Sequence, residues 1–387
     1  MRRVWLIAPV ALALALVIVA LTGDEERSRH IPSADGGLRR DVLRVDRSGW
    51  KTDFSKHNVP LSEFLSGGPP RDGIPPIDEP RPTSQTKADE WLSDREPVLA
   101  VAFGDRARAY PVQILVWHEI VNDSLGGRPV AVTYCPLCNS SLVFDRRIGD
   151  RTLTFGTTGN LRHSDLVMWD RQTQSWWQQL TTEAVVGKLT GTKLEVLPSQ
   201  TLSWGDFKRV YPHGDVLSRD TGFQRDYGST PYDQYDRPDV RPFLFDGKPD
   251  DRLPPKERVL AVFADDETVV VPFSRLAREP VIELEIGNRR VVALYKRGVA
   301  SPLDESSIEA SRDVGTAAAF EARAGDRALT FERRDGGFVD RETGSHWNIA
   351  GRAVAGKLAG KALTPVRHDQ QFWFALAAFV PDARIER

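Results

Sequence analysis

Two stretches decide how this chain of 387 residues is organised: FDRRIGDRTLTF at residues 144–155 and FEARAGDRALTF at residues 320–331. Eight of their twelve positions are identical, and a ninth is acidic in both. Such agreement at a separation of this size is typical of an internal repeat, in which one supersecondary unit occurs twice.

The agreement continues in the same order on both sides of these stretches. Upstream, VLAV occurs at 98–101 and again at 259–262; downstream, AVVGKLTG at 184–191 matches AVAGKLAG at 353–360. We therefore predict two tandem related modules from an internal duplication, at residues 98–221 and 259–387.

Short apolar segments separated by Gly-Asp and Gly-Gly turns fill the first module, and only a few stretches have helical character. The fold class expected is therefore β-rich α+β. Residues 24–97 are polar and rich in Pro and Gly, and are expected to form a tether and a wrapping arm. Residues 222–258 are dense in Asp, Pro, Tyr and Gly, and are expected to be a solvated linker.

Residues 1–23 have the pattern of a signal anchor or signal peptide. Arg2 and Arg3 precede an uncharged apolar run from Val4 to Leu21, and acidic residues follow it. Eighteen helical residues span about 27 Å, close to the bilayer core of about 30 Å. We favour an uncleaved single-pass anchor in the cell membrane with an extracytoplasmic body. Cleavage would instead give a secreted or periplasmic protein.

Composition excludes several classes of protein. The chain has 52 basic and 54 acidic side chains and a net charge of −2, so no overall field attracts nucleic acid. Its only cysteines are Cys135 and Cys138, which excludes both a framework of several disulfides and a zinc site of four thiolates from one chain.

The two modules differ at the residues best suited to chemistry. In the aligned order, the first-module residues and their counterparts are His118 and Glu279, Glu119 and Pro280, Cys135 and Lys296, and Cys138 and Val299. Positions shared by both modules most simply serve the common fold. Residues confined to the first module are candidates for a functional site.

Three hypotheses compete for the Cys135-Pro-Leu-Cys138 motif. The leading one is thiol-disulfide redox chemistry, in which the two cysteines cycle and His118, next to Glu119, assists deprotonation. This would make the protein a thiol oxidoreductase with Cys135, Cys138, His118 and Glu119 as catalytic residues. A structural disulfide is a further alternative, but so short a loop gains only about 2 kcal/mol.

The second hypothesis is a metal site. Two thiolates need one or two further ligands, and His118, His163 and Met168 are available in the first module. Thiolate, imidazole and thioether suit copper, whereas two thiolates with imidazole and carboxylate suit zinc. The sequence leaves the redox and metal hypotheses open, and a purely structural or interaction module is the third alternative.

Several motifs together resemble a known family. They are HEIVND at 118–123, TYCPLC at 133–138, FGTTG at 155–159, and MWDR at 168–171 followed by SWWQQ at 175–179. The chain is similar, from about residue 96 to its C-terminus, to domain of unknown function family 3179 of bacteria and archaea. The resemblance implies membership of that family and no particular activity.

Overall fold

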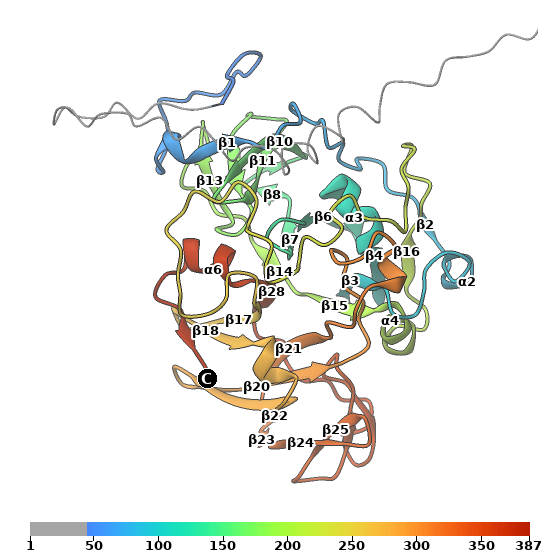
Figure 1. Ribbon diagram of the computed structural model, residues 1–387. Coiled ribbons are helices and arrows are strands. Elements are labelled where there is room, and N and C mark those ends of the chain that lie inside the picture. Colours follow the sequence, from blue (N-terminus) through green and yellow to red (C-terminus); the bar gives the residue numbers. More distant parts are fainter. Residues whose placement is uncertain (1–44) are drawn as a thin grey trace, which may run out of the picture.

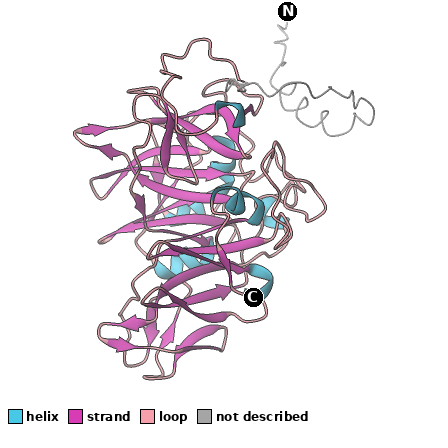
Figure 2. Ribbon diagram, turned by 90° about the vertical axis from the view of Figure 1, so that its left-hand side faces the viewer, coloured by secondary structure: helices cyan, strands magenta, loops and turns pink. Residues whose placement is uncertain are grey.

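A computed structural model describes residues 45–387. The predicted signal or anchor segment and the first part of the tether lie outside the described residues. Among those described, strands far outnumber helices, which confirms the β-rich fold class (Figures 1 and 2). The helices are short: α2 (Gln85–Ala88), α3 (Val112–His118), α4 (Trp204–Val210), α5 (Phe273–Leu276), α6 (Trp373–Phe379) and the single turns η1 (Leu61–Glu63) and η2 (Ile308–Ala310).

The first part of the chain forms three sheets and a small hairpin. Its strands are β1 (Phe64–Ser66), β2 (Pro82–Thr83), β3 (Pro97–Phe103), β4 (Arg106–Pro111), β5 (Ile120–Leu125), β6 (Arg128–Cys135), β7 (Ser140–Asp145), β8 (Arg147–Ile148), β9 (Arg151–Thr152), β10 (Phe155–Arg162), β11 (Asp165–Asp170), β12 (Trp176–Gln178), β13 (Glu183–Val186), β14 (Val196–Leu197), β15 (Ser199–Ser203) and β16 (Asp215–Leu217). The sheet orders are β15-β3-β4-β16-β2, β14-β7-β6-β5 and β1-β10-β11-β12-β13, and β8 pairs with β9.

The second part has a corresponding set of three sheets and a small hairpin. Its strands are β17 (Arg258–Ala264), β18 (Glu267–Pro272), β19 (Val281–Ile286), β20 (Arg289–Lys296), β21 (Thr316–Glu321), β22 (Arg323–Ala324), β23 (Arg327–Ala328), β24 (Phe331–Arg334), β25 (Gly337–Asp340), β26 (His346–Trp347), β27 (Ala353–Ala355), β28 (His368–Phe372) and β29 (Arg384–Ile385). The orders are β28-β17-β18-β29, β19-β20-β21 and β24-β25-β26-β27, with β22 paired to β23. The origin by duplication and the module boundaries stay predictions.

Turn residues fix the register of the hairpin that leads to the cysteines. Gly126 and Gly127 connect β5 to β6, and both have positive φ values, 58° and 77°. A two-residue hairpin turn with two positive φ values matches the twist of the flanking strands and is adopted most easily by glycine. The register it sets places Ile120 opposite Thr133 and Leu125 opposite Arg128.

The two parts share their hydrophobic cores. One core cluster packs Trp204 and Phe207 of the first part with Phe320 and Phe331 of the second. A second cluster contains both cysteines together with Phe372 and Phe374, among other residues. The two predicted modules are therefore packed into one body rather than strung apart.

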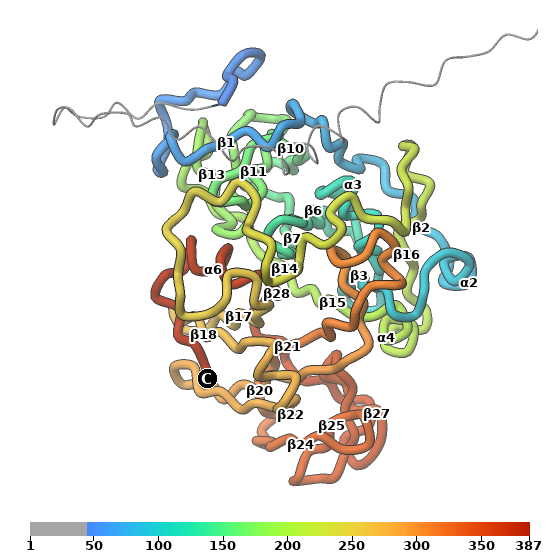
Figure 3. Tube along the Cα trace, in the orientation of Figure 1, coloured from blue at the N-terminus to red at the C-terminus, as the bar shows by residue number. Residues whose placement is uncertain are grey.

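The composition of the segment 222–258 predicted a solvated linker, but part of this segment is buried. Tyr235, Asp236 and Lys256 are buried, and Phe243 packs against the core cluster of the cysteines. Figure 3 shows this yellow stretch crossing the front of the molecule between the green first part and the orange second part.

The arm before residue 97 also packs on the body, because β1 pairs with β10 and β2 with β16. No helix among the described residues has the length and apolar character needed to cross a membrane.

Candidate functional site

The two cysteines lie in the tight connection between β6 and β7. Cys135 ends β6, and the chain turns back through Pro136 to Asn139, whose N–H donates to the Pro136 carbonyl at 3.2 Å. Asn139 takes a positive φ of 51°, which its short polar side chain tolerates. Both thiols are free and buried. The local turn therefore presents two thiols to the same interior space.

A second tight turn lies beside the thiols. β10 and β11 are joined by His163 and Ser164, with φ values of 51° and 70°, in a two-residue turn that usually favours glycine or asparagine. The Ser164 carbonyl accepts from the Cys135 and Cys138 thiols at 3.8 and 3.5 Å. Unusual backbone conformations of this kind are retained where the surroundings hold them, often at functional sites.

Asp165 follows that turn and completes a cluster of three ligand atoms. One carboxylate oxygen of Asp165 and the Sγ atoms of Cys135 and Cys138 lie within 4.8 Å of one another. Asp165 Oδ2 accepts from the Gln178 side-chain amide at 2.5 Å and from the Leu180 N–H at 3.0 Å. Its Oδ1 is buried and has no hydrogen-bond partner among residues 45–387. A buried carboxylate oxygen without a partner is costly unless a cation joins it.

Glu119 contributes a second buried carboxyl group to this region. It follows α3 directly and has φ 58°, a backbone conformation that is unfavourable for a long side chain. Burial, reinforced by the charge of Asp165, raises the pKa of Glu119 to about 8. Its charge also acts on Cys135. Glu119 is thus electrostatically coupled to two members of the cluster.

The thiols are not activated as nucleophiles by their surroundings. Burial raises the pKa of Cys135, hydrogen bonding with Cys138 lowers it in part, and Asp165 and Glu119 raise it further. Burial likewise raises the pKa of Cys138 well above its usual value, with Cys135 and Asp165 adding to the effect. Burial also raises the pKa of Asp165 to about 6. Burial is therefore the main influence on the pKa values of all three groups, and none of the described side-chain cations is among the groups that act on them most strongly.

The structure places His118 in a different set of contacts. Its Nδ1 lies 2.7 Å from the Pro75 carbonyl, which can only accept, so Nδ1 carries the proton. Nε2 is then an acceptor, and the Tyr227 hydroxyl lies 2.6 Å from it. Burial lowers the pKa of His118 to about 4, so the ring is neutral near pH 7. Neither of these hydrogen bonds reaches a thiol, and the imidazole is not part of the three-atom cluster.

Met168 is buried in β11, where it pairs with Trp177 of the neighbouring strand and belongs to the core cluster of both cysteines.

Sequence reasoning missed Asp165, although it lies in the stretch 156–169 that is longer in the first module than in the second. That length difference was the available signal.

The second part of the chain uses the position aligned with Cys135 differently. Lys296 ends β20 and pairs with Thr316, just as Cys135 ends β6 and pairs with Ser140. The Lys296 ammonium lies 2.5 Å from a carboxylate oxygen of Asp206 in α4. This position therefore carries an ion pair between the two parts of the chain.

A separate cavity lies away from the thiol cluster. It has a volume of about 540 Å³, and its lining residues include Trp91, Glu96, Arg219 and Tyr227. Neither cysteine, Asp165 nor Glu119 lines it. The thiol cluster is thus buried and lies outside this cavity.

No curated protein and no solved structure matches this chain. Residues 71–383 match the family described as protein of unknown function DUF3179, and this segment includes both cysteines, Glu119 and Asp165. The match extends over most of the chain and reaches further toward the N-terminus than the motifs alone indicated. The chain belongs to the DUF3179 family.

Proposed function

We propose that the protein binds one transition-metal ion, with Zn²⁺ the preferred ion, between the Cys135 and Cys138 thiolates and the Asp165 carboxylate. Glu119 is the candidate for the fourth ligand: it is outside the cluster of three ligand atoms, but its charge acts on Cys135. The observation that carries the proposal is the cluster of three buried ligand atoms no wider than 4.8 Å, and the poorly satisfied Asp165 Oδ1 adds to it. A divalent cation would supply the missing partner for this oxygen and would stabilise both thiolates.

The donor set favours zinc over copper. Zn²⁺ is commonly held by four ligands drawn from thiolate, imidazole and carboxylate groups, whereas Cu(I) prefers sulfur ligands. Here two sulfur atoms meet one carboxylate, with a second carboxylate nearby. The Met168 thioether is the remaining soft group, and selective copper binding that is lost in Met168→Leu would favour the copper form of the site.

Metal content and affinity test the proposal. The protein is purified under reducing conditions without chelators, and bound metal is measured by mass spectrometry and by competition with a chromophoric chelator. We expect one Zn²⁺ per chain and at least a 100-fold weaker affinity in Cys138→Ser and in Asp165→Asn. Glu96→Gln is the matched control, because Glu96 is also a buried carboxyl group, lies outside the cluster, and has no cluster member among the groups that act on its pKa. Equal affinity of Asp165→Asn and wild type contradicts the proposed ligand set.

Thiol-disulfide exchange is the second candidate, favoured by the adjacency of two free thiols in one short loop. In that reaction the two thiols form a disulfide and release two protons, while a disulfide of a partner protein takes up two electrons and becomes two thiols. Thiol titration at defined redox potentials separates the candidates. A metal-free wild-type protein whose cysteines cycle reversibly supports redox chemistry and rules out the metal site.

A further inference from the structure

Tyr235 links the two turns that form the thiol cluster. This buried residue comes from the segment 222–258, and its hydroxyl donates to the Leu137 carbonyl, inside the Cys135–Cys138 loop, at 3.1 Å. The same hydroxyl accepts the Phe243 N–H at 3.2 Å. One phenolic oxygen thus joins the cysteine loop to a second segment.

That second segment leads back to the cluster. The Phe243 carbonyl accepts a hydrogen bond from the Ser164 hydroxyl. The Ser164 carbonyl in turn accepts from both thiols, and Asp165 is the next residue. The contacts therefore close a ring from the cysteine loop through Tyr235, Phe243 and Ser164 to the thiols. The separation between the cysteine loop and Asp165 is set within this ring.

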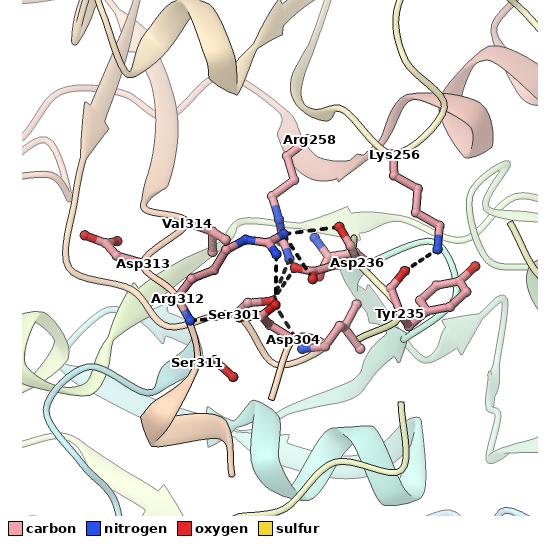
Figure 4. A network of polar contacts seen from close by, with 12 residues as sticks. Tyr235, Asp236, Lys256, Arg258, Ser301, Asp304, Ser311, Arg312, Asp313 and Val314 are labelled. Atoms are coloured by element: carbon pink, nitrogen blue, oxygen red, sulfur yellow. Dashed lines mark hydrogen bonds and ion pairs between the residues drawn. The ribbon is translucent and has the colours of Figure 1, made fainter. Parts of the chain in front are cut away.

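Tyr235 is itself held from the second part of the chain (Figure 4). The neighbouring Asp236 carboxylate lies 2.7 Å from Arg258, 2.5 Å from the Ser301 hydroxyl and 3.0 Å from Arg312. The Asp236 side chain is fully buried, so these charge-assisted contacts fix its position strongly. The Lys256 ammonium donates to the Tyr235 carbonyl and lies over its ring at 3.5 Å.

Arg258 also supports the other side of the cysteine loop. Its guanidinium lies over the Phe372 ring at 5.3 Å, and the Phe372 N–H donates to the Cys138 carbonyl at 2.9 Å. The loop is therefore held at Leu137 by a side chain and at Cys138 by a backbone group. Both of these contacts are connected to Arg258.

We propose that Tyr235 is a positioning residue for the metal site: its hydroxyl holds the cysteine loop at the distance from the Ser164–Asp165 turn at which one ion contacts all three ligands. This inference rests on the proposed metal-binding function. The hydroxyl touches neither the ion nor a ligand atom, and acts only through backbone groups. Residues that orient metal ligands from outside typically change metal affinity about 10- to 100-fold when altered.

Tyr235→Phe is the direct test, because it removes both hydrogen bonds of the hydroxyl while the ring stays in place. Tyr211→Phe is the matched control, since the described residues give its hydroxyl no hydrogen bond while its ring packs against Phe207. Ser164→Gly is a second variant, which breaks the same ring of contacts at its link to Phe243 and suits the positive φ of that position.

Three quantities are measured on each full-length protein: Zn²⁺ affinity by chelator competition, the visible absorption spectrum of the Co²⁺-loaded protein, and the free energy of unfolding of the metal-free protein. We expect about 10- to 100-fold weaker Zn²⁺ binding and a changed Co²⁺ spectrum in Tyr235→Phe and Ser164→Gly, at unchanged stoichiometry. Tyr211→Phe should match wild type.

The outcomes separate the two proposals. Wild-type protein that binds neither Zn²⁺ nor Co²⁺ overturns the metal-binding function and this inference with it. Wild-type binding together with unchanged affinity and spectrum in Tyr235→Phe overturns only the positioning role. Lower stability of Tyr235→Phe with unchanged affinity also overturns it, because the hydroxyl would then serve the fold alone.

Discussion

Asp165 has one satisfied and one unsatisfied oxygen. A buried charge without a full set of partners lowers stability, and removing it often raises stability. The residue can therefore be understood as a group that costs the metal-free protein stability and contributes only when a cation is bound. Asparagine at this position keeps one oxygen for Gln178 and Leu180, so the fold is expected to survive the change.

We predict that metal-free Asp165→Asn is more stable than metal-free wild type by about 1 kcal/mol at pH 8, where the carboxylate is ionised. Zn²⁺ should stabilise wild type but not the variant, because ligand binding to the native state adds stability. Urea denaturation with chelator and with added Zn²⁺ measures both effects. If the variant is less stable than wild type without metal, and Zn²⁺ stabilises both proteins equally, Asp165 serves the fold and does not bind the ion.

Asp369 gives a second pH dependence, which is caused mainly by burial, with a smaller contribution from the charge of Asp165. Burial raises its pKa from 3.8 to about 7, so the native state keeps a proton that the unfolded chain releases above pH 4. The unfolding free energy therefore falls as pH rises from about 4 to 7. In Asp369→Asn this contribution is gone. The free energy of unfolding of the variant, relative to that of wild type, should therefore rise across that window by up to about 1.4 kcal/mol per pH unit. Urea denaturation of metal-free protein at several pH values checks this, and a constant difference would contradict it.

At the scale of single elements, one turn occurs twice with the same hydrogen bonds. Asp170 accepts from the Thr173 backbone and hydroxyl, the Ser175 N–H and the Trp177 indole. Asp340 does the same in the second part of the chain, with Thr343, Ser345 and Trp347. Residues shared by both modules were predicted to serve the fold, and this turn supplies the physical reason.

We predict that Asp170→Ala and Asp340→Ala each lower the free energy of unfolding by about 3 kcal/mol or more, because several donors lose a charged acceptor in a buried turn. Zn²⁺ stoichiometry of the remaining folded protein should not change in Asp340→Ala. Denaturation curves and metal analysis test this. A loss below about 0.5 kcal/mol in either variant would mean that the turn is not a stabilising element.

Sequence reasoning located the part of the site that is local in the chain. Cys135 and Cys138 were recognisable because both thiols lie in one short motif. Asp165 and Tyr235 were not, because they meet the cysteine loop only through tertiary packing of a different hairpin and of the segment 222–258. His118 was paired with the thiols in the redox hypothesis, yet its hydrogen-bond partners, Pro75 and Tyr227, come from distant segments that no local pattern indicates.

At the scale of the whole molecule, the repeat predicted two modules but not how closely they depend on each other. Core clusters draw side chains from both parts, and Lys296 pairs with Asp206 across them. The backbone of β28 also contacts the cysteine loop at Cys138. A repeat does not show such shared burial, because it reports the similarity of two segments in sequence and not how they pack. The burial of Tyr235, Asp236 and Lys256 within the segment 222–258 was not predicted, because the partners that satisfy their polar groups come from other parts of the chain.

We predict that residues 45–221 expressed alone do not fold to a native state, and that the chain 45–387 unfolds in one cooperative transition. Removing the second part would expose the apolar side chains that it covers and would leave the Cys138 carbonyl without the Phe372 N–H. Near-ultraviolet circular dichroism and denaturation of both proteins test this. A well-packed 45–221 fragment with a sharp transition would show that the first module is independent.

X-ray absorption at the zinc edge of the Zn²⁺-loaded protein tests the central claim most directly, because it reports the ligand atoms themselves. The account predicts two sulfur atoms at about 2.3 Å and two oxygen atoms at about 2.0 to 2.2 Å, with one sulfur lost in Cys138→Ser. A spectrum without sulfur scattering, or one in which the sulfur contribution is the same in wild type and Cys138→Ser, would contradict a metal site built on the two cysteines.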